Sequence, residues 1–213
     1  MNIADIAFAS VLALSAIVAA ILVSRARGDA RRYVQFASAL YGALSLADLF
    51  ATAHASAQSQ LATAAIARIV LSLAPAALAL GFAASFEGPP PPAFAIAALV
   101  LGCTAGIAAA MTGAQFIAMA ALFASVCAIL TFAIRRWRAD QRSAIQAMVC
   151  GFTLLAGAAA DMTGGIEAQT SLALFSAAAL LGAALACAKR SNLVVEQPAL
   201  RHSNVIALVR RKR

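Results

Sequence analysis

The sequence predicts an all-α integral membrane protein with seven transmembrane helices. Of its 213 residues, 63% are hydrophobic and only 11% are charged, whereas soluble domains carry about 25% charged residues. The mean hydropathy is +0.90. Apolar stretches of about 20 residues, the length that crosses a bilayer, recur along the chain between short polar or proline-rich breaks.

Seven apolar stretches meet this length requirement. Four consecutive prolines at 89–92 cannot continue a helix and fix one boundary firmly. The break MTGAQ is the least marked, and without it there would be six spans with both termini on one side. We expect a transmembrane domain at 1–188 and a basic cytoplasmic tail at 189–213. The predicted spans are residues 3–24, 33–56, 61–84, 93–111, 114–134, 143–163 and 169–188.

The positive charges predict the orientation. Of the 16 Lys and Arg residues, all but Arg68 fall in loop 25–32, in loop 135–142 or in the tail. Cytoplasmic loops carry the excess of Lys and Arg, so we expect the N-terminus outside and the C-terminus inside a bacterial inner membrane. The first span does not resemble a cleaved signal peptide, because MNIAD contains no positively charged side chain.

Two basic loops suggest an internal repeat. RARGDARRYVQ (25–35) and RWRADQRSAIQ (136–146) match at five of eleven positions with an offset of 111, including Asp29 with Asp140 and Gln35 with Gln146. A duplication would relate spans one to three to spans five to seven by an axis along the membrane normal. This 3+1+3 layout resembles that of the SWEET and PQ-loop transporters, although their signature is absent. Alternatively, basic loops match by chance.

Two charges lie inside predicted spans. If the turn between spans two and three is centred at residue 58, Asp48 and Arg68 lie at equal depth on neighbouring helices. Because an isolated charge in hydrocarbon is costly, we expect the two to form an ion pair. The pair could be a structural link only, or part of a site for a solute, ion or proton. In a third alternative, Arg68 extends to the outer surface by itself.

Polar residues continue these faces. Tyr41 and Ser45 share a helix face with Asp48, and Ser72 shares one with Arg68, so all five are candidate ligand-site residues. A second polar stripe is predicted at Gln146, Thr153 and Asp161, with Cys150 and Gly157 between them. His54 and Glu167 are expected at an outer rim, together with Asp5. Small and hydroxyl residues that only join helices are the alternative to a cavity lining.

Motifs for catalysis or cofactors are not evident in the sequence. It has no nucleophile elbow, P-loop or HExxH motif, so we expect no enzyme, no cofactor and no metal. Cys103, Cys127, Cys150 and Cys187 form no CxxC pair. The two histidines fall on opposite sides of the predicted membrane, and no lysine lies deep in a span.

The predicted partners are the lipid bilayer, anionic lipids at the basic cytoplasmic face, and a second copy or another membrane protein, with no nucleic acid. Gly102-x-x-x-Gly106 is a helix-packing motif, which serves either such an interface or internal packing. The first functional hypothesis is a non-enzymatic sensory or accessory subunit that acts through lateral helix contacts. The alternative is a small-solute transporter with a cavity between the two three-helix halves.

Overall fold

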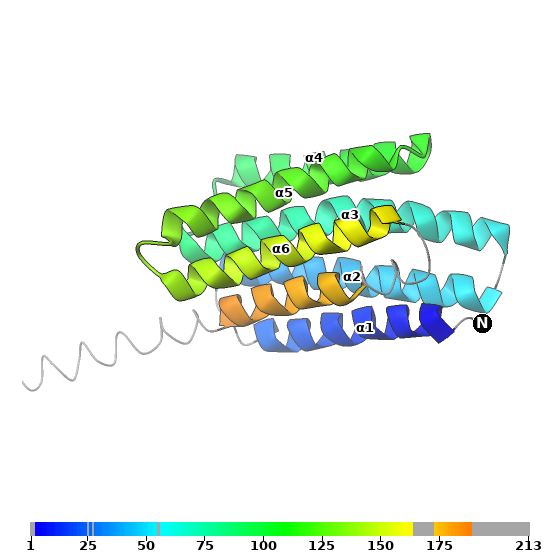
Figure 1. Cartoon of the computed structure of the whole chain (residues 1–213), viewed down its shortest axis with the longest axis horizontal. Coiled ribbons are helices and arrows are strands. Elements are labelled where there is room, and N and C mark those ends of the chain that lie inside the picture. The colour runs from blue at the N-terminus through cyan, green and yellow to red at the C-terminus, as the bar shows by residue number, and fades with distance from the viewer. Residues whose placement is uncertain (1–2, 25, 27, 55, 164–172, 189–213) are drawn as a thin grey trace, which may run out of the picture.

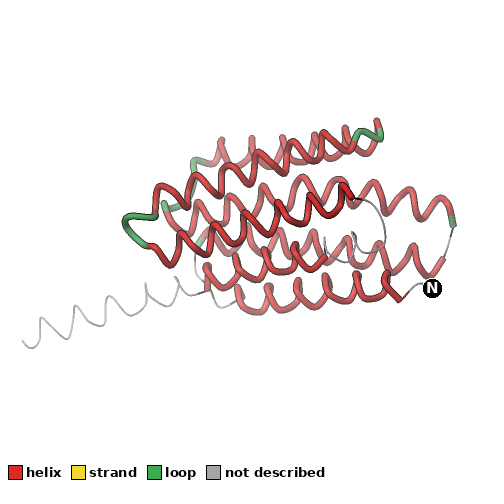
Figure 2. The backbone as a smooth tube through the Cα atoms, in the orientation of Figure 1, coloured by secondary structure: helices red, strands yellow, loops and turns green. Residues whose placement is uncertain are grey.

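The computed structural model describes residues 3–24, 26, 28–54, 56–163 and 173–188. Their regular structure is α-helical, and the helices run alternately up and down in one bundle (Figure 1; Figure 2). Six helices are long and apolar enough to cross a membrane, and a shorter apolar helix follows them at Ala173–Ala188. The six are α1 (Ile3–Ser24), α2 (Asp29–His54), α3 (Ala57–Phe86), α4 (Pro92–Thr112), α5 (Gln115–Arg136) and α6 (Gln141–Thr163).

Local capping chemistry sets several boundaries. Pro91 precedes α4 and Pro92 is its first residue, a position where the missing N–H costs nothing. The doubtful break between spans four and five is confirmed, because α4 ends at Thr112 and the next residue, Gly113, has a left-handed φ of 72°. Ser56 caps α3 by accepting a 3.1 Å hydrogen bond from the Ser59 backbone N–H. The polar segment SAQSQ (56–60), at the junction of the predicted spans 33–56 and 61–84, therefore forms the N-cap and first turn of α3.

Helix α3 is the central element of the bundle. It packs against α2, α4 and α5, and every residue from Val70 to Phe86 except Ala84 is buried. A helix surrounded by protein needs an apolar surface on all sides, and alanines supply it without bulk. Gly81 illustrates the close packing, since a Cβ there would lie 3.1 Å from Val34 of α2.

The Gly102-x-x-x-Gly106 motif packs inside the molecule. A Cβ at Gly102 would lie 3.2 Å from the Ser72 carbonyl oxygen, and a Cβ at Gly106 would lie 2.6 Å from the Ile69 Cα. Both glycines thus allow the backbones of α4 and α3 to approach each other directly. Of the two uses that the sequence left open, internal packing is the one formed here.

The seventh predicted span is described only in part. Ala173–Ala188 is helical, while 164–172 and the tail 189–213 lie outside the described residues. Cys150 of α6 donates a 3.6 Å hydrogen bond from its thiol to the Ala179 carbonyl, and Ser176 is buried near Tyr41 of α2. The short helix therefore packs between α6 and α2.

The register proposed for the repeat disagrees with the burial pattern. An offset of 111 would pair Tyr41, which is 1% exposed, with Phe152, which is 59% exposed. The matching acids have a local explanation. Asp29 is the first residue of α2, and Asp140 caps α6 by accepting a hydrogen bond from the Ser143 N–H at 3.2 Å. Carboxylates are favoured at helix N-termini, so two helix starts suffice to produce this match.

Candidate functional site

A polar cavity of about 480 Å³ lies between α1, α2, α3 and α5. Its lining residues come from the ends of these helices on the N-terminal side of the bundle, where α2 joins α3 and α4 joins α5 (Figure 1). Apolar residues, among them Leu44, Leu71 and Met119, line its part farther from this end. The polar side chains along the wall are Asp48 and Thr52 of α2, Gln60, Thr63 and Arg68 of α3, and Gln115 of α5.

The α3 wall follows helical spacing. Gln60, Thr63, Ala67 and Leu71 recur every three or four residues and therefore share one face. Thr63 also holds α3 to α2, because its hydroxyl donates a 3.1 Å hydrogen bond to the Ala47 carbonyl. The polar wall is thus part of a packed helix pair.

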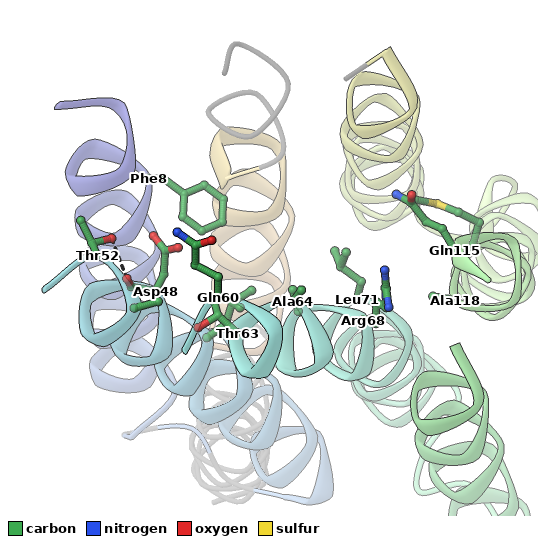
Figure 3. A pocket seen from close by; sticks show the side chains of 14 residues that line it. Phe8, Asp48, Thr52, Gln60, Thr63, Ala64, Arg68, Leu71, Gln115 and Ala118 are labelled. Carbon is green, nitrogen blue, oxygen red and sulfur yellow. Dashed lines mark hydrogen bonds between the residues drawn. The ribbon is translucent and has the colours of Figure 1, made fainter. Parts of the chain in front are cut away.

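The two charged residues lie apart within the cavity. Figure 3 shows Asp48 beside Thr52 and Gln60, whereas Arg68 lies farther along α3 beside Leu71. Thr52 donates a 2.7 Å hydrogen bond to the Asp48 backbone carbonyl, and the carboxylate atom Oδ2 is buried. The cavity therefore carries an acidic and a basic region at different places along its wall.

The predicted ion pair between Asp48 and Arg68 is wrong. Within the described part of the chain, the salt bridge formed is the one between Arg32 and Asp29, at 3.4 Å. Arg68 instead donates a hydrogen bond from Nη1 to the Ala109 carbonyl oxygen of α4, at 3.4 Å.

The position of the turn explains the error. Equal depth required a turn centred at residue 58, but α2 ends at His54 and α3 begins at Ala57. Asp48 is six residues before the end of α2, and Arg68 is eleven residues after the start of α3. At about 1.5 Å per residue, this difference of five residues places Arg68 about 7.5 Å deeper.

Arg68 forms its hydrogen bond with the C-terminal end of α4. Ala109 belongs to the last four residues of α4, whose carbonyl groups have no partner within the helix. A cation near a helix C-terminus is favoured both by these carbonyls and by the helix dipole. The guanidinium has five N–H donors, so this hydrogen bond leaves donors for the cavity.

The other three candidate ligand-site residues pack elsewhere. Tyr41 is 1% exposed, and Ser45 and Ser72 are fully buried. The Ser45 hydroxyl donates a 2.7 Å hydrogen bond to the Ala9 carbonyl of α1. The Ser72 hydroxyl donates a 2.6 Å hydrogen bond to the Arg68 carbonyl. Ser45 thus links α2 to α1, whereas Ser72 bonds within α3. Only Asp48 and Arg68 of the predicted set line the cavity.

Among the described residues of the second stripe and the rim, none lines the cavity. Thr153 donates a 2.9 Å hydrogen bond to the Cys150 carbonyl of its own helix, and Gln146 is half-buried near the opposite end of α6. His54 is exposed and stacks on Phe50, with ring centroids 4.0 Å apart. The side chain of Asp161 and all of Glu167 lie outside the described residues.

Sequence reasoning missed Thr52, Gln60, Thr63 and Gln115. Gln60 falls between the predicted spans 33–56 and 61–84, although it belongs to α3. Gln115 falls at the start of the predicted span 114–134, where no polar site is expected. The signal for Gln60 was present: Ser56 is a good N-cap residue, and starting α3 after it brings Gln60 and Thr63 onto one helix face. Gln115 is the first residue of α5, and only the tertiary structure places it beside α3.

Comparisons with protein-family models, characterised proteins and solved structures give no match to this chain. Among the described residues, no group of three or more His, Cys, Asp and Glu side chains could hold a metal ion. The cavity wall carries charged, amide and hydroxyl side chains.

Proposed function

We propose that this protein is a non-enzymatic multi-pass protein of a bacterial inner membrane that binds a small zwitterionic solute, acting as a sensory or accessory subunit. The observation that carries the proposal is the presence of one carboxylate and one guanidinium at different depths of the same cavity. The apolar helices support the membrane location.

The charge arrangement favours a zwitterion. Asp48 would attract an ammonium group and Arg68 a carboxylate, which it can bind through two parallel N–H groups. The difference in depth of about 7.5 Å exceeds one hydrogen bond of about 2.9 Å, so a bound molecule rather than a direct contact would connect the two groups. Gln60, Thr63 and Gln115 add donors and acceptors along the wall.

Binding to the purified protein tests this function. The solutes are an α-amino acid panel, together with the corresponding amines and carboxylic acids, each measured by calorimetry. We expect the zwitterions to bind most tightly and Asp48→Asn and Arg68→Gln each to weaken binding about 10- to 100-fold, the value of a charged hydrogen bond.

The exposed pair Asp29 and Arg32 provides the matched control. Asp29→Asn and Arg32→Gln remove the same charges outside the cavity, so binding should be unchanged. Equal loss in all four variants would show a general charge effect and contradict the proposal. Preserved binding in both cavity variants would contradict it as well.

The proposed topology places the N-terminus outside and the C-terminus inside the cell. In support, the connections α1–α2 and α5–α6, with Arg31, Arg32, Arg135 and Arg136 at the adjoining helix ends, lie at the bundle end opposite the cavity (Figure 1). We expect a phosphatase fused after Arg213 to be inactive and a fluorescent protein fused there to be bright. Periplasmic phosphatase activity from this fusion would reverse the topology and place the cavity on the cytoplasmic side.

The position of the cavity supports transport as the second candidate. It lies between α5 and the first three helices, as expected for a site between two halves. However, its deeper part is apolar, at Leu44, Leu71 and Met119, and transport would require these residues to separate. Uptake of a bound radiolabelled amino acid into proteoliposomes would favour transport, and binding without uptake would favour a sensory or accessory role.

A further inference from the structure

A second, apolar groove lies between α4 and α5, with α3 as its floor. Its volume is about 530 Å³, and small residues line most of it. Helices α4 and α5 both pack on α3 and contact each other less extensively. On the floor are Ala76, Ala79 and Ala83, which are buried, while Ala98 and Ala121 belong to the two walls.

The dimensions of the groove fit a single extended hydrocarbon chain. On α5 it extends from Ile117 to Phe132, which is about 22 Å at 1.5 Å per residue. A volume of about 530 Å³ over this length gives a mean cross-section of about 24 Å², which corresponds to a width of about 5–6 Å, whereas a helix with side chains is about 10–12 Å across. A helix of a partner protein or of a second copy is therefore too wide for it.

A positive charge lies beyond one end of the groove. Ala128, Phe132 and Arg135 follow one another at spacings of four and three residues and share one face of α5, and the first two line the groove. Arg135 is exposed. The neighbouring Arg136 is used differently, because its guanidinium donates a hydrogen bond to the Phe86 carbonyl of α3.

We propose that this groove binds an anionic phospholipid, with one acyl chain between α4 and α5 and the phosphate at Arg135. The inference rests on the membrane location proposed above but not on solute binding in the polar cavity. The basic end of the groove lies at the bundle end assigned to the cytoplasmic side, where the inner leaflet is rich in anionic lipid. The groove accepts the chain, and Arg135 selects the headgroup.

Native mass spectrometry of the full chain in detergent tests the proposal, with dioleoyl phosphatidylglycerol and dioleoyl phosphatidylcholine titrated in parallel. We expect one phosphatidylglycerol to be retained in preference to phosphatidylcholine. Arg135→Gln should weaken this binding about fivefold, the effect of one basic residue near the surface. The control Arg142→Gln removes an exposed arginine from α6 at the same end and should leave binding unchanged.

Filling the groove tests the acyl-chain part separately. Ala121→Phe and Ala98→Phe, from opposite walls, should each abolish retention of both lipids, whereas Ala43→Phe on the exposed side of α2 should not. Thermal unfolding in detergent identifies any variant that does not fold. If one of the two groove variants fails to fold, the variant on the opposite wall is used for the test. Equal affinity for the two lipids, unchanged binding in a folded groove variant, or a dimer that disappears in Ala98→Phe would overturn the proposal. Extraction of the chain from membranes by alkaline carbonate would instead contradict the membrane location itself.

Discussion

Gly106→Ala is expected to lower the free energy of unfolding by about 2 kcal/mol. The added Cβ would lie 2.6 Å from the Ile69 Cα and 2.7 Å from the Ser72 hydroxyl, distances that require movement. The Ser72 side chain could rotate, but Ile69 contributes a backbone atom, so α4 must shift away from α3. Overpacking of this kind costs about 1–3 kcal/mol, and the better helix propensity of alanine offsets less than about 1 kcal/mol of it.

Two other glycines provide matched controls in helices. A Cβ at Gly42 would meet the Ala16 Cβ at an ordinary 3.8 Å, and one at Gly182 would meet nothing within 4 Å. Gly42→Ala and Gly182→Ala should therefore leave stability unchanged or raise it by about 0.5–1 kcal/mol. Denaturant unfolding in detergent micelles measures all three variants. If Gly106→Ala were as stable as the controls, α4 and α3 would not approach closely at this motif.

The helices of the bundle could be predicted from the sequence because their signals are local. Apolar length located the spans, and the prolines at 89–92 and Gly113 marked the two ends of α4. The predicted starts of α2 and α6, at residues 33 and 143, were less accurate, because α2 begins at Asp29 and α6 at Gln141. Polar residues start these helices because carboxylates satisfy the free N–H groups there, which a hydropathy criterion does not detect.

The candidate site could be predicted only in part. Asp48 and Arg68 were identified because a charge in an apolar span needs an explanation, and both line the cavity. Their relation to each other depended on the exact turn between α2 and α3, where an error of about two residues altered the relative depth. The spacing of Tyr41 and Ser45 places them on the same helix face as Asp48. Packing, however, decides which neighbouring helix each of these residues contacts. The hydrogen bond from Ser45 to Ala9 of α1 has no local sequence signal.

Arg68→Leu is expected to lower the free energy of unfolding by about 2 kcal/mol. The variant loses the hydrogen bond from a charged donor to the Ala109 carbonyl, and such hydrogen bonds contribute about 1.5–3 kcal/mol. It also leaves the C-terminal end of α4 without its cation. Arg32→Leu is the control, because this arginine is exposed and its salt bridge with Asp29 contributes at most about 1 kcal/mol.

Combining Arg68→Leu with Asp48→Asn distinguishes the helix-end role of Arg68 from an ion pair. In a true buried pair, the first substitution leaves an uncompensated charge, and the second removes that charge and restores stability. Here the two side chains form no salt bridge with each other, and Arg68 donates its hydrogen bond to Ala109 of α4. The effects should therefore add to within about 0.5 kcal/mol, as for residues that do not interact. Recovery of more than half of the Arg68→Leu loss in the double variant would show that Asp48 and Arg68 interact after all. Additive losses would instead show that neither charge is neutralised by the other across the cavity.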